Sequence, residues 1–442
     1  MKTSETESDF FGKAKISAIL LKITPPVMLA QLIQALYNIV DSFFVGKYSD
    51  DALTALSVIF PIQLIIIALA VGTGVGVNTY MAQKDALGKS EDADRAAGTG
   101  IVLAVSTWIL LAVASVMLLP RYVAASASSE TAVSYAVTYG SIVCIGSIFS
   151  FLEGIFTKVH QARGNMARPM VAQIVGAVVN IILDPVLIFG IGYIPSLGVA
   201  GAAYATVAGQ LVAAVITAFG AVKKPPAPKR MAHYVKRIYF FGYSSIMMQA
   251  LYTVYISILN MILADFSDSA VTVLGLYYKL QTFFFIPLFG LQTCIVPVLS
   301  YNYARKEYQR CRSTMSLSFL VSALFMLVGV VGFVFFPNAL ISLFADSASV
   351  HEIGRIAFPI IGSAFIPAVF SLIMPTFFQA IGMGVKSTLL SLTRQIFCLV
   401  PLFYLFSLAG LDYCWIAFPA SEIISGSVGM LAYRATVKKW NC

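Results

Sequence analysis

Two aspartates, Asp41 and Asp184, lie in long apolar stretches of the chain, and each ends a polar stripe with helical spacing. The stripes are Gln34, Asn38 and Asp41 in the first stretch and Gln173, Asn180 and Asp184 in the second. A carboxylate in a poorly solvated cavity resists ionisation, and two carboxylates close together resist it more. Such a pair can carry a proton at neutral pH, or hold Na⁺ together with amide and hydroxyl oxygens, so we interpret it as a candidate cation site.

A simpler interpretation of Asp41 is that it caps the end of its helix, which the neighbouring Gly46 and Lys47 indicate. The second half of the chain does not reproduce the pair. In a weak internal repeat, the positions that match Asp41 and Asp184 are Ile256 and Val400. The sequence therefore assigns a cation site to the N-terminal half alone.

Four further polar residues occupy apolar stretches of the second half. Arg394 and Glu422 fall on neighbouring expected helices, about 7 Å apart in depth at 1.5 Å per residue. We expect the two charges to neutralise each other, with substrate binding as the alternative role. Lys279 and Gln281 lie together in another apolar stretch, and they are candidates for lining a central cavity.

The elements that carry these residues must be membrane-spanning helices. The chain has 442 residues, of which 59% are hydrophobic and 11% charged, whereas soluble proteins carry about 25% charged residues. Charge-free runs such as 52–81 exceed the roughly 20 residues that span a bilayer as a helix, and they are too long for barrel strands of about 10. The fold class is therefore an all-α polytopic membrane protein. Its twelve predicted spans are 18–45, 53–82, 97–119, 132–154, 169–192, 197–221, 238–264, 270–300, 316–337, 354–378, 387–408 and 413–434.

The loops between these spans form two alternating sets with very different charge. One set, which includes both termini and the 222–237 segment, holds most of the 29 Lys and Arg, and the other holds only Lys47 and Arg121, plus Arg355 at the mouth of a span. Positive loops stay in the cytoplasm, so both termini are expected there, in a plasma (inner) membrane protein. The net charge of +9 is then a topology signal, and no nucleic-acid partner is expected.

A weak internal repeat divides the chain into two halves. Gln-Ala-Leu-Tyr at 34–37 recurs at 249–252, and further short matches follow in the same order. We predict an N-terminal six-helix lobe at 1–221, an extended cytoplasmic linker at 222–237 and a C-terminal six-helix lobe at 238–442. Because six is even, the two lobes should be related by a pseudo-twofold axis along the membrane normal, as in many transporters.

Three runs in this order resemble the multidrug and toxic compound extrusion (MATE) family, and the similarity extends over essentially the whole chain. They are YNIVDSFFVG at 37–46, NIILDP at 180–185 and GVAGAAYAT at 198–206. The resemblance implies export of amphipathic, often cationic drugs in exchange for H⁺ or Na⁺. It also implies that Asp41, Asn180, Asp184 and Thr206 form the cation site, and that Pro26 is a bend point in the first helix.

We therefore expect a secondary antiporter for small molecules, with no cofactor beyond the coupling ion, the lipid bilayer as its environment and a monomeric state. A flippase for lipid-linked sugars is the alternative, although the sequence offers few cations to hold a pyrophosphate. An intramembrane enzyme is not expected, because His160, His233 and His351 all fall in connecting segments. A passive channel is disfavoured because no repeated filter loop is recognisable.

Overall fold

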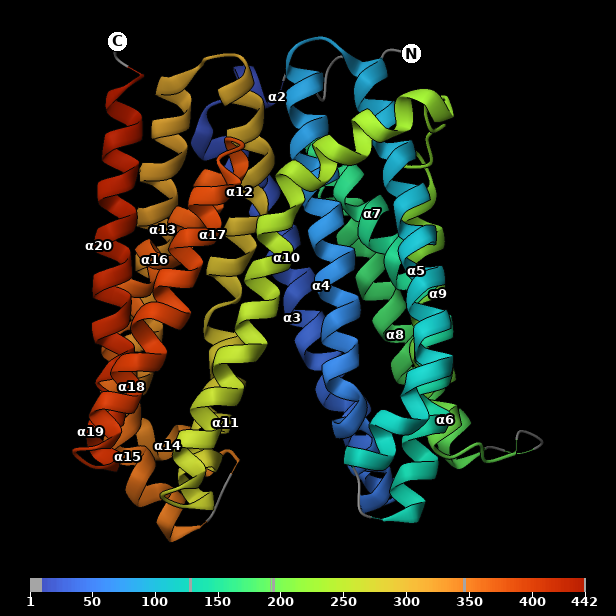
Figure 1. The fold of residues 1–442 in the computed structure, drawn as a ribbon, viewed down its shortest axis with the longest axis vertical. Helices are drawn as coiled ribbons and strands as arrows, with labels where there is room; N and C mark the ends of the chain where they lie inside the picture. The colour runs from blue at the N-terminus through green and yellow to red at the C-terminus, as the bar shows by residue number, and fades with distance from the viewer. Residues whose placement is uncertain (1–9, 127–128, 191, 193–194, 345–346, 441–442) are drawn as a thin grey trace. The chain divides into compact units, whose positions relative to one another are not determined.

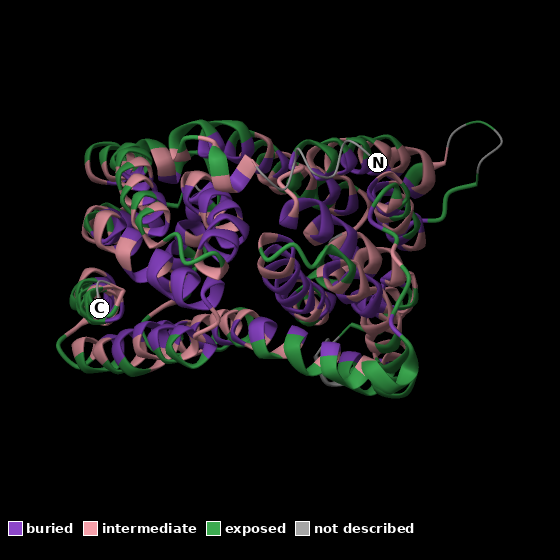
Figure 2. Cartoon of the chain, turned by 90° about the horizontal axis from the view of Figure 1, so that it is seen from above, coloured by how far each residue is buried: buried purple, intermediate pink, exposed green. Residues whose placement is uncertain are grey.

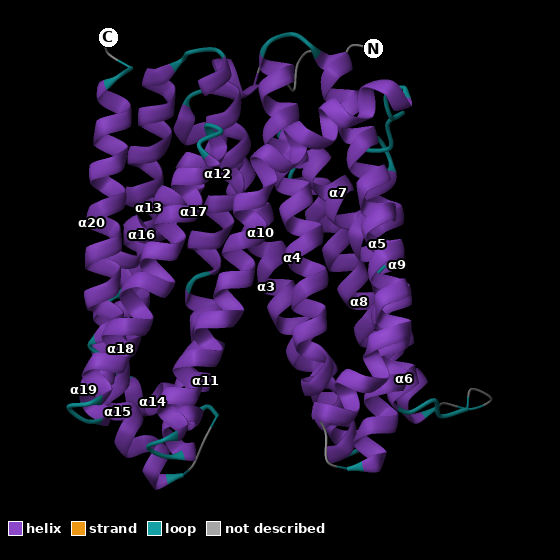
Figure 3. Ribbon diagram, viewed as in Figure 1, coloured by secondary structure: helices purple, strands orange, loops and turns teal. Residues whose placement is uncertain are grey.

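The computed structural model describes residues 10–126, 129–190, 192, 195–344 and 347–440. Within these residues the chain forms helices joined by short loops, and no strand is present (Figure 3). Nine of the described helices are long and apolar enough to cross a membrane, and three bent pairs raise the number of spans to twelve. The twelve predicted spans each correspond to one of these helices or pairs, so the predicted fold class is confirmed.

The chain divides into two compact units within one long helix, between Ile246 and Met247, and residues Lys15–Leu20 group with the second unit. The helices that build the first unit are α2 (Phe10–Lys13), α3 (Ile16–Tyr48), α4 (Asp50–Ala86), α5 (Ser90–Ser126), α6 (Glu130–Gly146), α7 (Ile148–Ala162), α8 (Ala167–Phe189), α9 (Val199–Ala218) and the first part of α10 (Pro228–Ala264) (Figure 1).

The second unit takes the rest of α10 and the helices that follow it. These are α11 (Asp268–Phe284), α12 (Ile286–Ala304), α13 (Tyr308–Phe335), α14 (Pro337–Ser342), α15 (Ala348–Ser363), α16 (Phe365–Ala380), α17 (Gly384–Leu392), the π-helix η1 (Thr393–Leu399), α18 (Val400–Ser407), α19 (Leu411–Cys414) and α20 (Ala417–Lys438).

Three of the predicted spans are sharply bent pairs of helices. The bends are 41° between α6 and α7, 54° between α11 and α12, and 52° between α15 and α16. Pro287 lies in the first turn of α12, where its missing N–H and its ring favour a new helix over continuation of the old one. At the first bend no proline intervenes, and Ser147 instead donates to the Cys144 carbonyl oxygen over 2.7 Å.

The segment between the predicted lobes is shorter in the structure than the 222–237 linker that we expected. Helix α10 begins at Pro228, so within the predicted linker only residues 222–227 are outside regular helix. Proline suits the first helical position, whereas Pro225 and Pro226 disfavour helix in the residues before them. The linker crosses α5 at Gly98, where an added Cβ would lie 2.5 Å from the Lys224 carbonyl carbon.

Burial follows the helix faces. In each unit, the residues on the faces that the helices turn toward one another are buried, and those on the outer faces are exposed (Figure 2). Several fully apolar side chains on outer faces are more than two-thirds exposed, among them Leu110, Met117 and Met261. Water would oppose such a surface, whereas a bilayer solvates it. The described chain is therefore a multi-pass membrane protein.

Helices α8 and α9 approach closely at a pair of glycines. A Cβ added to Gly176 would lie 2.7 Å from the Gly209 carbonyl oxygen, and one added to Gly209 would lie 2.6 Å from the Gly176 carbonyl oxygen. Only glycine permits this contact. It sets the distance between α8, which carries Asn180 and Asp184, and α9, which carries Thr206.

Replacing Gly209 by Leu is therefore expected to separate α8 from α9 and to lower stability by about 1–3 kcal/mol, the usual cost of overpacking a core. Thermal unfolding of the purified protein in detergent measures the effect. Gly275→Leu on α11 is the matched control, since a Cβ at Gly275 meets nothing within 4 Å. Equal unfolding temperatures for both variants would show that the glycine contact is not needed.

Candidate functional site

Asp41 and Asp184 meet inside the first unit. Asp41 lies on α3 and is 9% exposed, and Asp184 lies on α8 and is fully buried. Their carboxyl groups are within hydrogen-bonding reach of each other. One turn before Asp184 on α8, Asn180 donates from Nδ2 to Asp184 Oδ1 over 3.4 Å. The structure therefore brings together the two aspartates that the sequence places at the ends of separate polar stripes.

Asp41, Asp184 and Asn180 each have a side-chain oxygen that lacks a hydrogen-bond donor among the described residues. Asp41 Oδ1, Asp184 Oδ2 and Asn180 Oδ1 are buried, and none receives a hydrogen bond from the described part of the protein. Two ionised carboxylates have only acceptor atoms, so they cannot hydrogen-bond to each other without a shared proton. A proton or a small cation bound by oxygen ligands is what this cluster can accommodate chemically.

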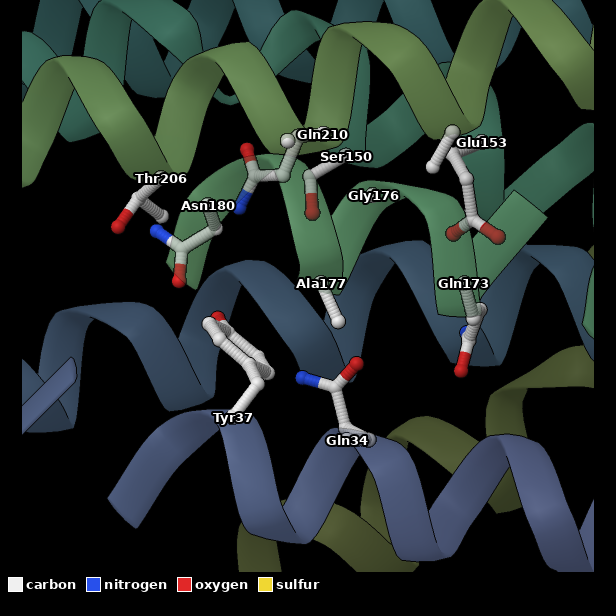
Figure 4. A pocket seen from close by; sticks show the side chains of 12 residues that line it. Gln34, Tyr37, Ser150, Glu153, Gln173, Gly176, Ala177, Asn180, Thr206 and Gln210 are labelled. Carbon is white, nitrogen blue, oxygen red and sulfur yellow. The ribbon is translucent and has the colours of Figure 1, made fainter. Parts of the chain in front are cut away.

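A polar cavity of about 100 Å³ lies between α3, α7, α8 and α9 of the same unit. Its lining includes Gln34, Tyr37, Glu153, Gln173, Asn180 and Thr206 (Figure 4). Tyr37 contacts Gln34 through a side-chain hydrogen bond and lies close to Asp41 and Asp184. Asn180 and Tyr37 thus connect the cavity to the acidic pair, so a ligand in the cavity would lie near the bound cation.

The other residues singled out from the sequence lie elsewhere. Asn38 is exposed, and unlike Gln34 and Tyr37 it is not among the residues that line the cavity. Lys279 is exposed on α11 and Gln281 is buried on the same helix. Neither residue belongs to this cavity.

Pro26 lies inside α3, and the helix is continuous through Pro25 and Pro26. The helix-1 bend that the family resemblance implies at Pro26 stays a prediction.

Glu153 is a cavity residue that we did not predict from the sequence. It lies on α7 and is half-buried. The sequence places it at the second-to-last position of the predicted 132–154 span, where an acidic residue is expected to face water. Because α7 continues to Ala162, Glu153 instead lies well inside a helix. The predicted span already contained this carboxylate, and its position inside an apolar segment was the signal that could have identified it.

Arg394 and Glu422 form a buried ion pair in the second unit. Arg394 Nη2 lies 2.6 Å from Glu422 Oε1, and Arg394 Nε donates to both carboxylate oxygens over 2.9 and 3.0 Å. Ser371 also donates to Glu422. Arg394 belongs to the π-helical turn η1, a local widening that is frequent at functional sites. The geometry is that of two charges that neutralise each other.

Comparisons with known proteins agree with this picture of a multi-pass membrane protein. The MatE family model matches residues 26–186 and 244–405. A FAD transporter of Shewanella oneidensis is 25% identical over 425 residues, covering 93% of both chains. The multidrug export protein MepA of Staphylococcus saprophyticus is 22% identical over 447 residues, covering 97% of both.

Two solved structures share the fold along their whole length. One is a MOP superfamily transporter from Pyrococcus furiosus, described as having a binding pocket of reverse polarity, with a TM-score of 0.92, 21% identity and full coverage of both chains. The other is an outward-facing multidrug resistance MATE family transporter, with a TM-score of 0.91, 22% identity and coverage of 100% and 99%.

The family match covers most of the chain and includes both repeats. The chain therefore belongs to the MatE family, the multidrug and toxic compound extrusion (MATE) transporters. The predicted family resemblance is confirmed.

Proposed function

We propose that this protein is a secondary antiporter that exports amphipathic or cationic small molecules in exchange for H⁺ or Na⁺. The observation that carries the proposal is the contact between the buried carboxyl groups of Asp41 and Asp184, which requires a proton or a cation between them. Releasing that cation leaves like charges together in a poorly solvated site, which is unfavourable. We therefore expect the cation-bound and cation-free forms of the aspartate pair to favour different conformations of the first unit. Coupling requires such a difference.

Multidrug export by MepA proteins, which the chain resembles over nearly its full length, supports an amphipathic substrate. Export of FAD is a second candidate, because a FAD transporter is also similar to this chain. The lining of the cavity favours the first candidate. Its only formally charged residue is Glu153, and none of the described lining residues is Lys or Arg. A diphosphate, in FAD or in a lipid-linked sugar, would meet repulsion there and no cation to pair with.

Transport of a fluorescent cation into everted membrane vesicles tests the proposal. A pH gradient and a Na⁺ gradient are imposed separately, and ethidium accumulation is followed by fluorescence. One of the two gradients is expected to drive accumulation, and vesicles without the protein are the control. Accumulation of FAD in place of ethidium would favour the second candidate, and an accumulation of ethidium that neither gradient increases would contradict the antiporter proposal.

We also propose that both termini face the cytoplasm, since the basic loops lie on that side. In intact cells, a cysteine at Ala227 should resist labelling by a membrane-impermeant thiol reagent, while one at Lys47 should react. Both positions are exposed, and the five described native cysteines are buried; Cys442→Ser removes the sixth. The reverse labelling pattern would overturn the orientation.

We further propose that the transport cycle needs no enzymatic chemistry and no cofactor beyond the ion, and that a single chain in the bilayer carries it out.

A further inference from the structure

Glu153 lies beside Gln173 at one end of the cavity, and Asn180 and Thr206 lie at the other end (Figure 4). Its Oε1 accepts from Thr157 Oγ1 over 2.6 Å, and its carboxyl group also contacts Gln173 through a side-chain hydrogen bond. Gln173 and Asp184 are both on α8 and are eleven residues apart, which is about 16 Å along the helix. Glu153 is thus a separate acidic centre in the same cavity.

The surroundings of Glu153 differ from those of Asp41 and Asp184. The aspartates each have an oxygen without a donor, whereas Thr157 and Gln173 both contact the Glu153 carboxyl. The aspartate pair therefore leaves oxygens open to a cation, whereas the Glu153 carboxyl group is held in place at the cavity wall by two hydrogen-bonding neighbours.

The rest of the cavity wall is neutral and presents acceptors. Gln34, Ser150 and Gln210 are among its residues. Gln210 Oε1 and Asn180 Oδ1 are buried and receive no hydrogen bond from the described residues, and Asn180 is only 2% exposed. Buried acceptors without donors are costly, and a ligand that carries N–H groups removes that cost.

Lys158 lies five residues further along α7 and acts on Glu153 electrostatically. Its Nζ donates to Gln161 Oε1 over 2.9 Å. Lys158 is not among the described lining residues. Among the described lining residues, Glu153 is therefore the only one with a carboxyl group, and none has an amino or guanidinium group.

We propose that Glu153 determines the charge of the substrate: it binds a cationic group of the transported molecule at its end of the cavity and repels anions such as FAD. This inference rests on the proposed function, and it assigns substrate selection and ion coupling to different carboxylates. Ion binding then changes the conformation through Asp41 and Asp184, while Glu153 contacts the cationic group of the substrate.

The test compares Glu153→Gln, Glu153→Asp and the control Glu130→Gln, which makes the same carboxyl-to-amide change at an exposed position of α6. Equilibrium binding of ethidium, a permanent cation with two amino groups, is measured by its fluorescence with purified protein in detergent. Glu153→Gln is expected to weaken binding about tenfold or more, the usual size of a lost charge-assisted contact. Glu153→Asp should restore most of the affinity, and Glu130→Gln should leave it unchanged.

Transport measurements on the same variants separate this inference from the proposed function. With Glu153→Gln, the KM for ethidium should rise while the number of ions moved per ethidium stays at the wild-type value, and the preference for ethidium over FAD should fall. Unchanged ethidium affinity would overturn the inference. So would an altered ion ratio, which would place Glu153 in the coupling site. If the wild type binds ethidium through Glu153 but neither gradient moves it, the antiporter proposal fails and the binding role of Glu153 stands.

Discussion

Asp184→Asn is expected to abolish ion-driven export while leaving substrate binding in place. The substitution keeps the shape of the side chain and its contact with Asn180, but it fixes a neutral group where we propose that the wild type alternates between two charge states. Without that alternation, ion binding no longer changes the balance between conformations, so an ion gradient cannot drive transport. Initial rates of gradient-driven efflux should fall to the level of vesicles without the protein.

Asp41→Asn should have the same effect, and the double variant should be scarcely worse than either single variant. Residues that act as one unit give strongly non-additive losses, and the two carboxyl groups are in contact. The control is ethidium binding to each purified variant, which should remain close to wild type because the proposed substrate contact is at Glu153. Full gradient-driven transport by either single variant would remove that residue from the coupling site.

The second large effect is expected at the ion pair of the C-terminal unit. Arg394→Met leaves Glu422 buried, with Ser371 as its remaining hydrogen-bond donor. Removing one partner of a buried pair usually costs about 3–5 kcal/mol, because the remaining charge is desolvated and unpaired. Glu422→Gln likewise leaves Arg394 buried without its ion-pair partner. Either variant should give a much lower unfolding temperature and a lower yield of folded protein.

The double variant, Arg394→Met with Glu422→Gln, should recover part of this loss, since it leaves no unpaired charge. Arg95→Met is the matched control. Its partner Glu91 is four residues away on α5 and 79% exposed, and exposed pairs of this kind contribute less than about 1 kcal/mol. Additive losses for Arg394 and Glu422 would mean that the two side chains stabilise the protein independently of each other.

Sequence reasoning predicted these features where they depend on position along a helix. Charge-free length determines where a span lies, so the ends of the twelve spans could be placed within 10 residues of the observed helix ends, and most of them within 4. Depth along a span is also readable from sequence, and this is why the contact between Arg394 and Glu422 could be anticipated across two neighbouring spans. The spacing of Asn180 and Asp184 on α8 likewise reports directly on a shared face.

Some features depend on how a helix is rotated about its axis, or on how far it extends beyond the bilayer. These features could not be predicted in this way. Asn38 has nearly the spacing of the α3 stripe, yet the rotation of the helix turns it out of the cavity. Glu153 falls inside the predicted 132–154 span but next to its end, where a charged residue is usual. Helix α7 runs past that end to Ala162, and hydropathy does not detect such an extension. Helix α10 starts within the predicted linker for a similar reason, since its first residues are polar but helical.

Reciprocal ion movement is the most direct test of the antiporter account, because coupling between two ligands acts in both directions. Purified protein is reconstituted into liposomes with no initial ion gradient, ethidium is added on one side, and the internal pH and Na⁺ concentration are followed with fluorescent indicators. The account predicts that ethidium entry drives H⁺ or Na⁺ out through the wild-type protein and that Asp184→Asn moves neither ion. Ethidium entry with no movement of either ion through the wild type would contradict it.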